Sequence, residues 1–205
     1  WGDHCNATVS LAEAGRITCL STSSDFLAAR LYRSITLLLG MKPDEHEYKV
    51  MGLAGYAKED YIQGPLKVFA GTQYVSDLGF AYHERPSDLY FYFKEKLEGF
   101  RFDSIAGAVQ AYTEELLTRW AAHAVKSTGA ARVVFGGGVG MNVKAMMRIA
   151  ALPEVDELFV CPSPSDESLA IGAAYVYMHD CLATNGRNPD EVLQPLSNAY
   201  LGPSL

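Results

Sequence analysis

Short apolar segments near the start of the chain predict two strands, and apolar residues at helical spacing predict helices after them. Residues 8–11 and 16–20 fit strands joined by a turn at 12–15, the pattern of a β-hairpin. Ser24 or Asp25 can cap a helix that runs to Leu39 and ends at Gly40. A shorter helix is expected within residues 45–57.

The pattern is weakest in residues 60–102, which carry many aromatic residues but few clear periods. We interpret residues 57–102 as an insertion with short strands and helices. The helix that follows is predicted to be long, capped by Asp103 and closed by Gly129. It presents one buried stripe of residues at steps of three or four: Ile105, Val109, Tyr112, Leu116 and Trp120.

A strand, a glycine turn, a helix and a second strand follow in order. The predicted strands are residues 133–135 and 158–160, and the helix between them is residues 143–152. A right-handed crossover makes such strands parallel, so the loops after both strands leave the same edge of the sheet. Ligands of open α/β sheets bind at that edge. A last helix is expected from Ser168 to Thr184, and residues 189–205 are interpreted as a linker.

The glycine turn is the strongest candidate for chemistry. Gly136, Gly137 and Gly138 follow a predicted strand directly, and glycine allows both positive φ and the close approach of a ligand to the main chain. The run matches neither the dinucleotide fingerprint nor the Walker A loop. A plain tight turn remains the alternative. We favour ligand contact, because adjacent glycines destabilise a fold through chain entropy unless close approach is needed.

Other candidate residues have ordinary structural interpretations beside the functional ones. Asp166 stands just before a helix, where Asp is a preferred N-cap, and an N-cap is more frequent than a metal ligand. Glu47 and Lys49 would by default form an exposed ion pair on a helix. The five histidines are dispersed without metal-site spacing, so a self-contained histidine metal site is not expected.

Composition narrows the function classes. The net charge is −7 and the 17 Lys and Arg residues are scattered, which disfavours nucleic-acid binding. No apolar run approaches the roughly 20 residues that span a membrane, and the first residues do not resemble a signal peptide. The four cysteines form no Cys-x-x-Cys pair, so a zinc site of that kind is not expected. We interpret them as reduced thiols of a cytoplasmic protein. Cys161 is expected in the core.

Four segments follow one another along the chain: EYKVMGLAGY at 47–56, FGGGVGMNVKA at 135–145, PSPSDESLAIGAAY at 162–175 and YLGPS at 200–204. In these segments the chain resembles the NodU/CmcH carbamoyltransferases, which include O-carbamoyltransferases of nodulation-factor and antibiotic biosynthesis. The resemblance covers nearly the whole chain except residues 57–102.

The resemblance implies an α/β fold, an RNase H-like lobe of the actin/Hsp70/sugar-kinase (ASKHA) fold, with a mixed sheet and flanking helices. Residues 1–188 would form the second of two lobes. Residues 189–205 would lead toward a C-terminal YrdC-like domain. Both that domain and the first lobe would lie outside this sequence. In such enzymes carbamoyl phosphate and ATP give carbamoyl-adenylate, and the carbamoyl group then passes to a substrate hydroxyl with help from a divalent metal, usually iron.

The resemblance also assigns roles to residues. Gly136, Gly137 and Gly138 match the glycine motif beside the adenosine, and Asn142 is its closing asparagine. Glu47 and Lys49 match a motif near the ribose. Gly2 and Asp3 match the end of a phosphate loop, and Asp166 matches a metal-binding aspartate. The first aspartate of the phosphate loop and a pair of histidines, the other metal ligands, would lie outside this sequence. The catalytic base cannot be assigned.

We therefore expect part of a carbamoyltransferase that is inactive as an isolated fragment. Two alternatives stay open. One is the lobe of a sugar-kinase-like phosphotransferase, and the other is a non-catalytic nucleotide-binding module. A half-domain of this kind would expose an apolar face, which predicts self-association.

Overall fold

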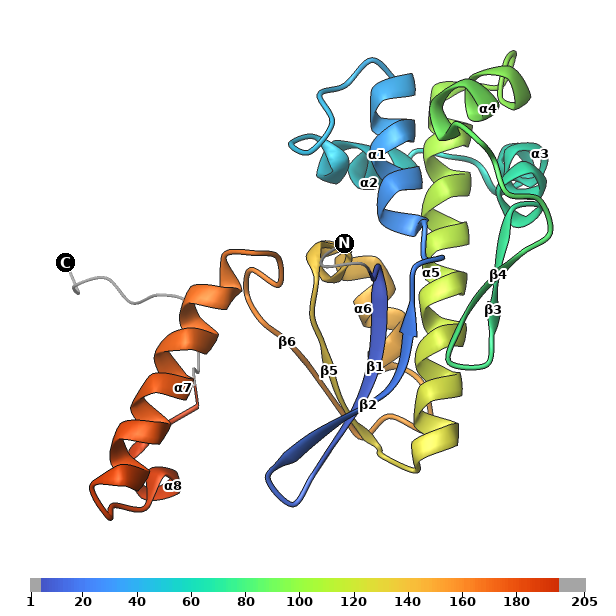
Figure 1. The fold of residues 1–205 in the computed structure, drawn as a ribbon. Helices are drawn as coiled ribbons and strands as arrows, with labels where there is room; N and C mark the ends of the chain where they lie inside the picture. Colours follow the sequence, from blue (N-terminus) through green and yellow to red (C-terminus); the bar gives the residue numbers. More distant parts are fainter. Residues whose placement is uncertain (1–4, 196–205) are drawn as a thin grey trace. The chain divides into compact units, whose positions relative to one another are not determined.

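The structure is a computed structural model and describes residues 5–195. Figure 1 shows its helices and strands in chain order. The chain divides into two compact units, which are described separately. The larger unit is Trp1–Val133 with Asn142–Leu158, and the smaller unit is Val134–Met141 with Phe159–Leu205.

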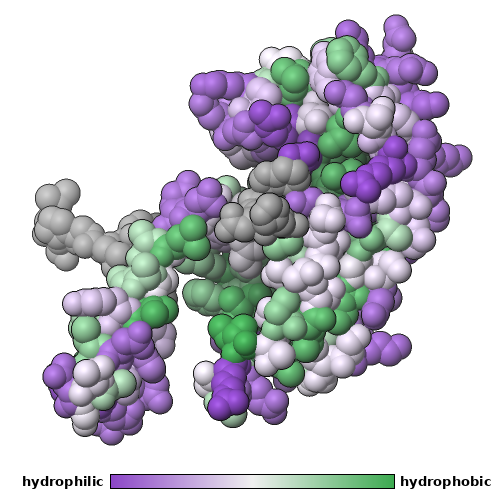
Figure 2. Space-filling model, viewed as in Figure 1, coloured by the Kyte–Doolittle hydropathy of each residue, from purple (hydrophilic) through white to green (hydrophobic). Residues whose placement is uncertain are grey.

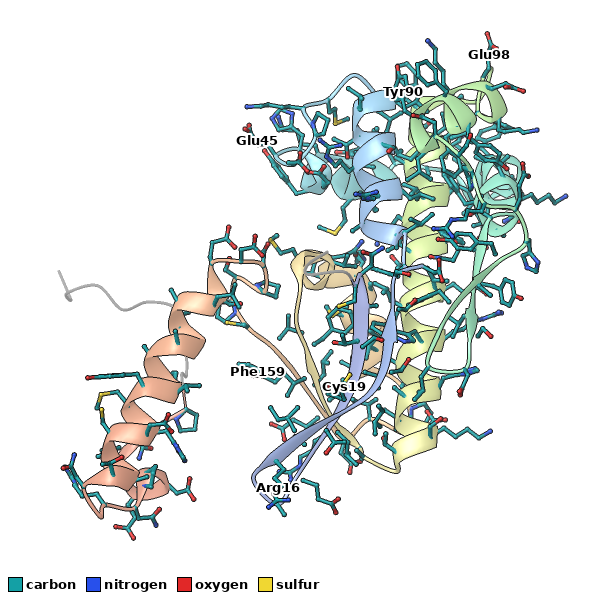
Figure 3. The ribbon with its side chains drawn as sticks, viewed as in Figure 1. Arg16, Cys19, Glu45, Tyr90, Glu98 and Phe159 are labelled. Carbon is teal, nitrogen blue, oxygen red and sulfur yellow. The ribbon has the colours of Figure 1, made fainter. Side chains whose placement is uncertain are left out.

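The larger unit opens with the predicted hairpin. Strands β1 (Ala7–Glu13) and β2 (Arg16–Ser23) pair antiparallel from Ala7 opposite Ser23 to Glu13 opposite Arg16. The turn is two residues long, shorter than expected. Ala14 and Gly15 both have positive φ, 50° and 74°, as the tight turns that suit twisted strands require. Figure 3 shows Arg16 at the tip of the hairpin and Cys19 farther along β2.

Helix α1 (Ala28–Leu38) begins later than predicted, and neither Ser24 nor Asp25 caps it. Its N-cap is Leu27, without a side-chain hydrogen bond. The Asp25 carboxylate instead forms an ion pair with Arg85 at 3.2 Å. The C-terminal boundary is confirmed by Gly40, with a φ of +75°. Helix α2 (Glu47–Ala54) follows within the predicted range, and Glu45 lies in the loop before it (Figure 3).

The core of the larger unit is built around α5 (Phe102–Thr128), the long helix that the apolar stripe predicted. Helices α1, α2 and α3 pack against it, as does α6. Asp103 is not its N-cap as expected. Arg101 holds that position, and the Asp103 carboxylate accepts hydrogen bonds from Arg101 and from the Ser104 N–H. Gly129 closes the helix in the left-handed conformation, as predicted.

Residues 57–102 contain short helices and strands, as predicted. They are α3 (Glu59–Ala70), β3 (Gln73–Ser76), β4 (Gly79–Tyr82) and α4 (Leu89–Lys96), with β3 and β4 antiparallel. Phe69 and Phe93 are fully buried with ring centroids 5.1 Å apart, and Phe69 also stacks on Tyr112 of α5. The segment therefore contributes to the core of the larger unit. Its origin as an insertion stays a prediction.

Strands β5 (Arg132–Phe135) and β6 (Glu157–Val160) pair with each other, and α6 (Val143–Ala150) connects them. At their starts the Asp156 N–H donates to the Ala131 carbonyl at 2.9 Å. Past their ends the Gly137 N–H donates to the Pro164 carbonyl at 2.7 Å. The starts of β5 and β6 lie beside each other, and so do their ends. The two strands are therefore parallel, as predicted.

The α/β class is confirmed, but the expected mixed sheet is not. The strands of residues 5–195 form three two-stranded sheets, β1–β2, β3–β4 and β5–β6. On β2 the side chains of Ile17 and Leu20 are exposed. Figure 2 shows apolar residues at the surface near the polar tip of the hairpin. A two-stranded sheet leaves strand edges and faces uncovered, which explains this exposure.

The smaller unit contains a short 3-10 turn at Gly138–Met141, helix α7 (Ser168–Thr184) and helix α8 (Pro189–Val192). Helix α7 has the predicted bounds. The predicted linker is not wholly irregular, because Asn188 caps the one-turn α8 through a hydrogen bond from the Asp190 N–H. Cys161 lies just after β6 and is half-buried, so it is not a core residue as expected.

Two surface properties bear on the function class. Helix α7 exposes the apolar side chains Leu169, Val176, Tyr177 and Met178. No helix of the described residues combines the length and the apolar character needed to cross a membrane.

Candidate functional site

The glycine turn of the smaller unit is held by its own backbone. Gly137 has a φ of +95°, a conformation that favours glycine. Its N–H donates to the Pro164 carbonyl, and its carbonyl accepts from the Gly140 N–H at 2.8 Å. The loop after β5 is therefore fixed to the loop after β6, and the two form one surface within the smaller unit, as the sequence predicted.

Packing explains one glycine that the sequence analysis did not single out. A Cβ added to Gly140 would lie 3.2 Å from Pro164 and 3.3 Å from Phe135, tighter than nine in ten real Cβ contacts. Gly140 is buried, while Gly136, Gly137 and Gly138 are not. Gly140 is thus the glycine that lets the two loops close together. Its place in the run Gly-Val-Gly-Met was the only signal in the sequence.

Gly136 and Gly138 have no comparable internal reason to be glycine. Among residues 5–195 a Cβ on Gly136 would meet nothing within 4 Å, and on Gly138 it would lie 3.5 Å from the Ser165 hydroxyl, an ordinary contact. Neither has a positive φ. A ligand that lies against the backbone would supply the missing reason.

Asp166 lies on the same pair of loops and is exposed. The N-cap interpretation is wrong, because Glu167 occupies the N-cap position of α7 and makes no side-chain capping bond. Within the described part of the chain, Asp166 contributes its carbonyl, which accepts the Leu169 N–H at 3.1 Å. Within residues 5–195 no group of three His, Cys, Asp or Glu side chains is placed to hold a metal. The described residues therefore do not form a metal site by themselves.

Asn142 belongs to the larger unit, where it is the N-cap of α6. Its side-chain oxygen accepts the Ala145 N–H at 3.1 Å. The same side chain pairs with Gln110 of α5 in both directions. Gln110 Nε2 donates to Asn142 Oδ1 at 2.9 Å, and Asn142 Nδ2 donates to Gln110 Oε1 at 3.0 Å.

Gln110 is the centre of a buried polar network that the sequence analysis missed. Tyr32 of α1 donates its hydroxyl to Gln110 Oε1 at 2.8 Å, and Gln110 Nε2 donates to Glu114 at 2.8 Å. Glu114 is also paired with Arg148 of α6 at 2.9 Å. The signal in the sequence was a single polar residue inside the apolar run Ile105–Tyr112.

Glu47 contributes charge near this network. Burial raises the pKa of Tyr32 well above its ordinary value, and the carboxylates of Glu114 and Glu47 raise it further. The Tyr32 hydroxyl is therefore protonated throughout the physiological range and acts as a donor. The Glu47 carboxylate also accepts the Asp44 N–H at 2.8 Å.

The expected ion pair between Glu47 and Lys49 is not formed among the described residues. Residues two apart point away from each other on a helix. Lys49 Nζ lies 3.0 Å from His46 Nε2 instead, at an exposed position. Both residues of the predicted ribose motif thus lie on the first turn of α2 without neutralising each other.

Comparison with known proteins gives the family. Residues 12–175 match the family model described as carbamoyltransferase N-terminus. The chain belongs to this family. The matched range contains three of the four motifs, at 47–56, 135–145 and 162–175.

Two relatives of the carbamoyltransferase-family chain are themselves uncharacterized proteins. One, from Synechocystis sp., is 27% identical over 190 residues, which are 84% of this chain and 30% of the relative. The other, from Methanocaldococcus jannaschii, is 31% identical over 183 residues, which are 84% of this chain and 34% of the relative. The chain spans about a third of the length of these relatives.

Some predicted residues of the carbamoyltransferase pattern lie outside the described residues. Gly2 and Asp3, assigned to a phosphate loop, precede residue 5, and the motif at 200–204 follows residue 195. Their roles stay predictions.

Proposed function

We propose that the chain is part of an ATP-dependent O-carbamoyltransferase, which transfers a carbamoyl group from carbamoyl-adenylate to the hydroxyl of a small molecule. In this proposal the chain is an RNase H-like lobe of an actin-like fold, and carbamoyl phosphate and ATP supply the carbamoyl-adenylate. The family match over residues 12–175 supports the class of reaction.

The observation that carries the nucleotide part of the proposal is the open backbone at Gly136. This residue does not have a positive φ, and within the part of the chain that the structure describes it has no neighbour that a Cβ would meet. It follows a parallel strand directly, and such strand ends are where α/β proteins bind nucleotides. We assign the adenosine to the backbone of Gly136, Gly137 and Gly138, and further nucleotide contacts to Asn142, Glu47 and Lys49.

The chemistry has a simple balance. The oxygen of the acceptor hydroxyl attacks the carbamoyl carbon, the bond between that carbon and the phosphate oxygen breaks, and AMP leaves. The hydroxyl proton passes to a base that we do not assign. Negative charge grows on the carbonyl oxygen and on the departing phosphate, so fixed donors aimed at these atoms lower the barrier. Holding the adenosine orients the carbamoyl group toward the acceptor.

Asp166 is proposed as one ligand of a divalent metal, iron in the first instance. Because residues 5–195 hold no cluster of three suitable side chains, its other ligands would come from elsewhere in the whole protein. We derive no step of the reaction through this metal.

The exposed apolar side chains of α7 suggest a partner surface. We propose that other parts of the protein cover them, and that the isolated 205 residues self-associate and are inactive. We also propose that the protein is cytoplasmic, is not attached to a membrane and does not bind nucleic acid.

The test uses the full-length protein that carries this chain, with ATP, carbamoyl phosphate and a divalent metal. We expect pyrophosphate and the phosphate of carbamoyl phosphate to be released when carbamoyl-adenylate forms, and AMP to be released when the carbamoyl group passes to water or to an added hydroxyl acceptor, all measured by ³¹P NMR. Formation of ADP would indicate the phosphotransferase alternative, and ATP binding without turnover would indicate the non-catalytic module.

A Gly136→Val variant tests the assignment of the adenosine. Its free energy of unfolding should stay close to that of the wild type, because the added atoms meet nothing at Cβ. Its affinity for ATP in calorimetry should fall at least about tenfold. Unchanged affinity in the folded variant would remove the adenosine from this turn.

A further inference from the structure

The hydrogen bonds around Asn142 fix which way its amide points. The Ala145 N–H can only donate, so the Asn142 atom that faces it must be the oxygen. The nitrogen then faces Gln110 Oε1. The Ala145 N–H selects which end of the amide faces α6, and the two bonds to Gln110 hold the amide in that orientation.

The same reasoning fixes Gln110 from its other partners. The Tyr32 hydroxyl bonds to its oxygen, and the Glu114 carboxylate, which can only accept when ionised, bonds to its nitrogen. With the two bonds to Asn142, both donors and both acceptor sites of the Gln110 amide are used. Gln110 is 5% exposed, so an amide flip would leave several buried groups unpaired, which is strongly unfavourable.

Asn142 retains one unused group. Its oxygen accepts two hydrogen bonds, and one of its two N–H groups donates to Gln110. The second N–H has no partner among residues 5–195. Asn142 is half-buried rather than enclosed, and we infer that this N–H can meet a bound molecule.

We propose that Gln110 is a positioning residue for nucleotide binding, which holds Asn142 so that it offers an N–H donor and no acceptor to the nucleotide. The inference rests on the proposed function, since it takes Asn142 as a nucleotide contact. The matching group on the ligand is a hydrogen-bond acceptor, such as a ring nitrogen of adenine or an oxygen of the ribose or phosphate. The exocyclic amine of adenine, a donor, is excluded as its partner.

The specificity follows from the hydrogen-bond polarity. A free asparagine turns its amide to suit donors and acceptors alike. Asn142 held by Gln110 rejects a donor at the same place, because two donors would face each other and the buried network cannot turn to accommodate them. The network therefore contributes to selection of the ligand and not only to stability.

The experiment measures ATP affinity by calorimetry in the full-length protein, as a double-mutant cycle of Gln110→Met and Asn142→Ala. Thr113→Val is the matched control. Thr113 is a buried polar residue on the same helix, but its hydroxyl bonds to the Val109 carbonyl of its own helix. We expect each single variant of the cycle to bind ATP about tenfold more weakly, and Thr113→Val to bind as the wild type does.

The decisive result is the double variant. If Gln110 acts through Asn142, the double variant binds no more weakly than Asn142→Ala alone. Losses that multiply, to about a hundredfold, would overturn the inference, as would a Gln110→Met variant with wild-type affinity or a Thr113→Val variant with an equal loss.

A second measurement does not depend on ligand binding. In the ¹⁵N-labelled protein, the two side-chain amide protons of Asn142 should give sharp resonances, and Gln110→Met should shift and broaden them, because only the bond from the Ala145 N–H still holds the amide. Unchanged resonances in a folded Gln110→Met variant would overturn the positioning role. Failure of the proposed function would give a different result from failure of the positioning role, because the wild type itself would then bind no ATP. In that case the inference would fail as well.

Discussion

Gln110 and Asn142, 32 positions apart in the chain, hydrogen-bond through both halves of their side-chain amides. Gln110 Nε2 donates to Asn142 Oδ1 at 2.9 Å, and Asn142 Nδ2 donates to Gln110 Oε1 at 3.0 Å. The pair joins the first third of α5 to the start of α6. Asn142, which the proposed function assigns to the nucleotide, is therefore held by the core of the larger unit.

Asn142→Ala should destabilise the protein by about 2–4 kcal/mol. It removes the cap of α6, which contributes about 1–2 kcal/mol, and leaves Gln110 with unpaired buried groups. Urea unfolding measures the change. Asn188→Ala, which removes the exposed cap of α8, is the control and should have an effect below about 1 kcal/mol. Equal effects of the two variants would show that the buried pair adds nothing.

Gly137→Ala and Gly99→Ala should destabilise the protein by similar amounts, about 1–2 kcal/mol each. Both glycines have a positive φ, 95° and 85°, and a Cβ on either would meet no atom within 4 Å. The loss comes from backbone strain alone in both variants. Only Gly137→Ala should also weaken ATP binding, as measured by calorimetry. Equal ATP affinity of the two variants would contradict a nucleotide at the glycine turn.

Gly107→Ala tests how residues 57–102 pack on the long helix. A Cβ on Gly107 would lie 2.5 Å from the Ala57 Cβ and 2.8 Å from Ile62. Overpacking of this kind costs about 1–3 kcal/mol and exceeds the gain in helix propensity. Gly172→Ala on α7 has open space and should be neutral or stabilising. The midpoints of thermal unfolding of the two variants, compared with the wild type, test this prediction. A Gly107→Ala protein more stable than the wild type would disprove this packing.

Alkaline pH should destabilise the larger unit through Tyr112. Burial raises the pKa of Tyr112 from 10.0 to about 12. The unfolded state then loses its proton first, so the stability from this tyrosine is complete below pH 10 and is lost as pH rises toward 12. At pH 11 the loss is about 1.4 kcal/mol. Urea unfolding at pH 9 and 11 should show this extra pH dependence in the wild type.

Tyr112→Phe is the control for the alkaline effect. It loses the hydroxyl that donates to the Gln73 carbonyl at 2.9 Å, so it should be less stable at pH 9 by about 1 kcal/mol. Between pH 9 and 11 its stability should fall less than that of the wild type. An identical decline in both proteins would assign the alkaline effect to other groups.

Asp166→Ala should leave the stability within about 0.5 kcal/mol of the wild type, since the side chain is exposed and does not cap α7. If Asp166 is a metal ligand, the variant should lose the dependence of turnover on added iron(II) or manganese(II). Glu167→Ala, at the adjacent exposed position, should keep it. Loss of metal dependence in both variants, or in neither, would argue against Asp166 as a ligand.

The sequence by itself determined the elements whose signals are local. The hairpin, the long helix with its closing Gly129 and the parallel pair β5–β6 were all predictable, because turn glycines and helical spacing act over a few residues. The glycine turn and its neighbouring loop were found for the same reason. The motifs also sufficed to indicate the family.

Only the tertiary structure decided which polar side chains meet. Three aspartates resemble helix caps in the sequence: Asp25, Asp103 and Asp166. None of them occupies the N-cap position of its helix. Partners of the side chain or the geometry of the local turn determine where the first N–H groups of each helix lie. Gln110 looked like one polar residue in an apolar stretch. Its role came from Tyr32, Glu114 and Asn142, brought together from three helices by the packing of the core, which no local pattern encodes.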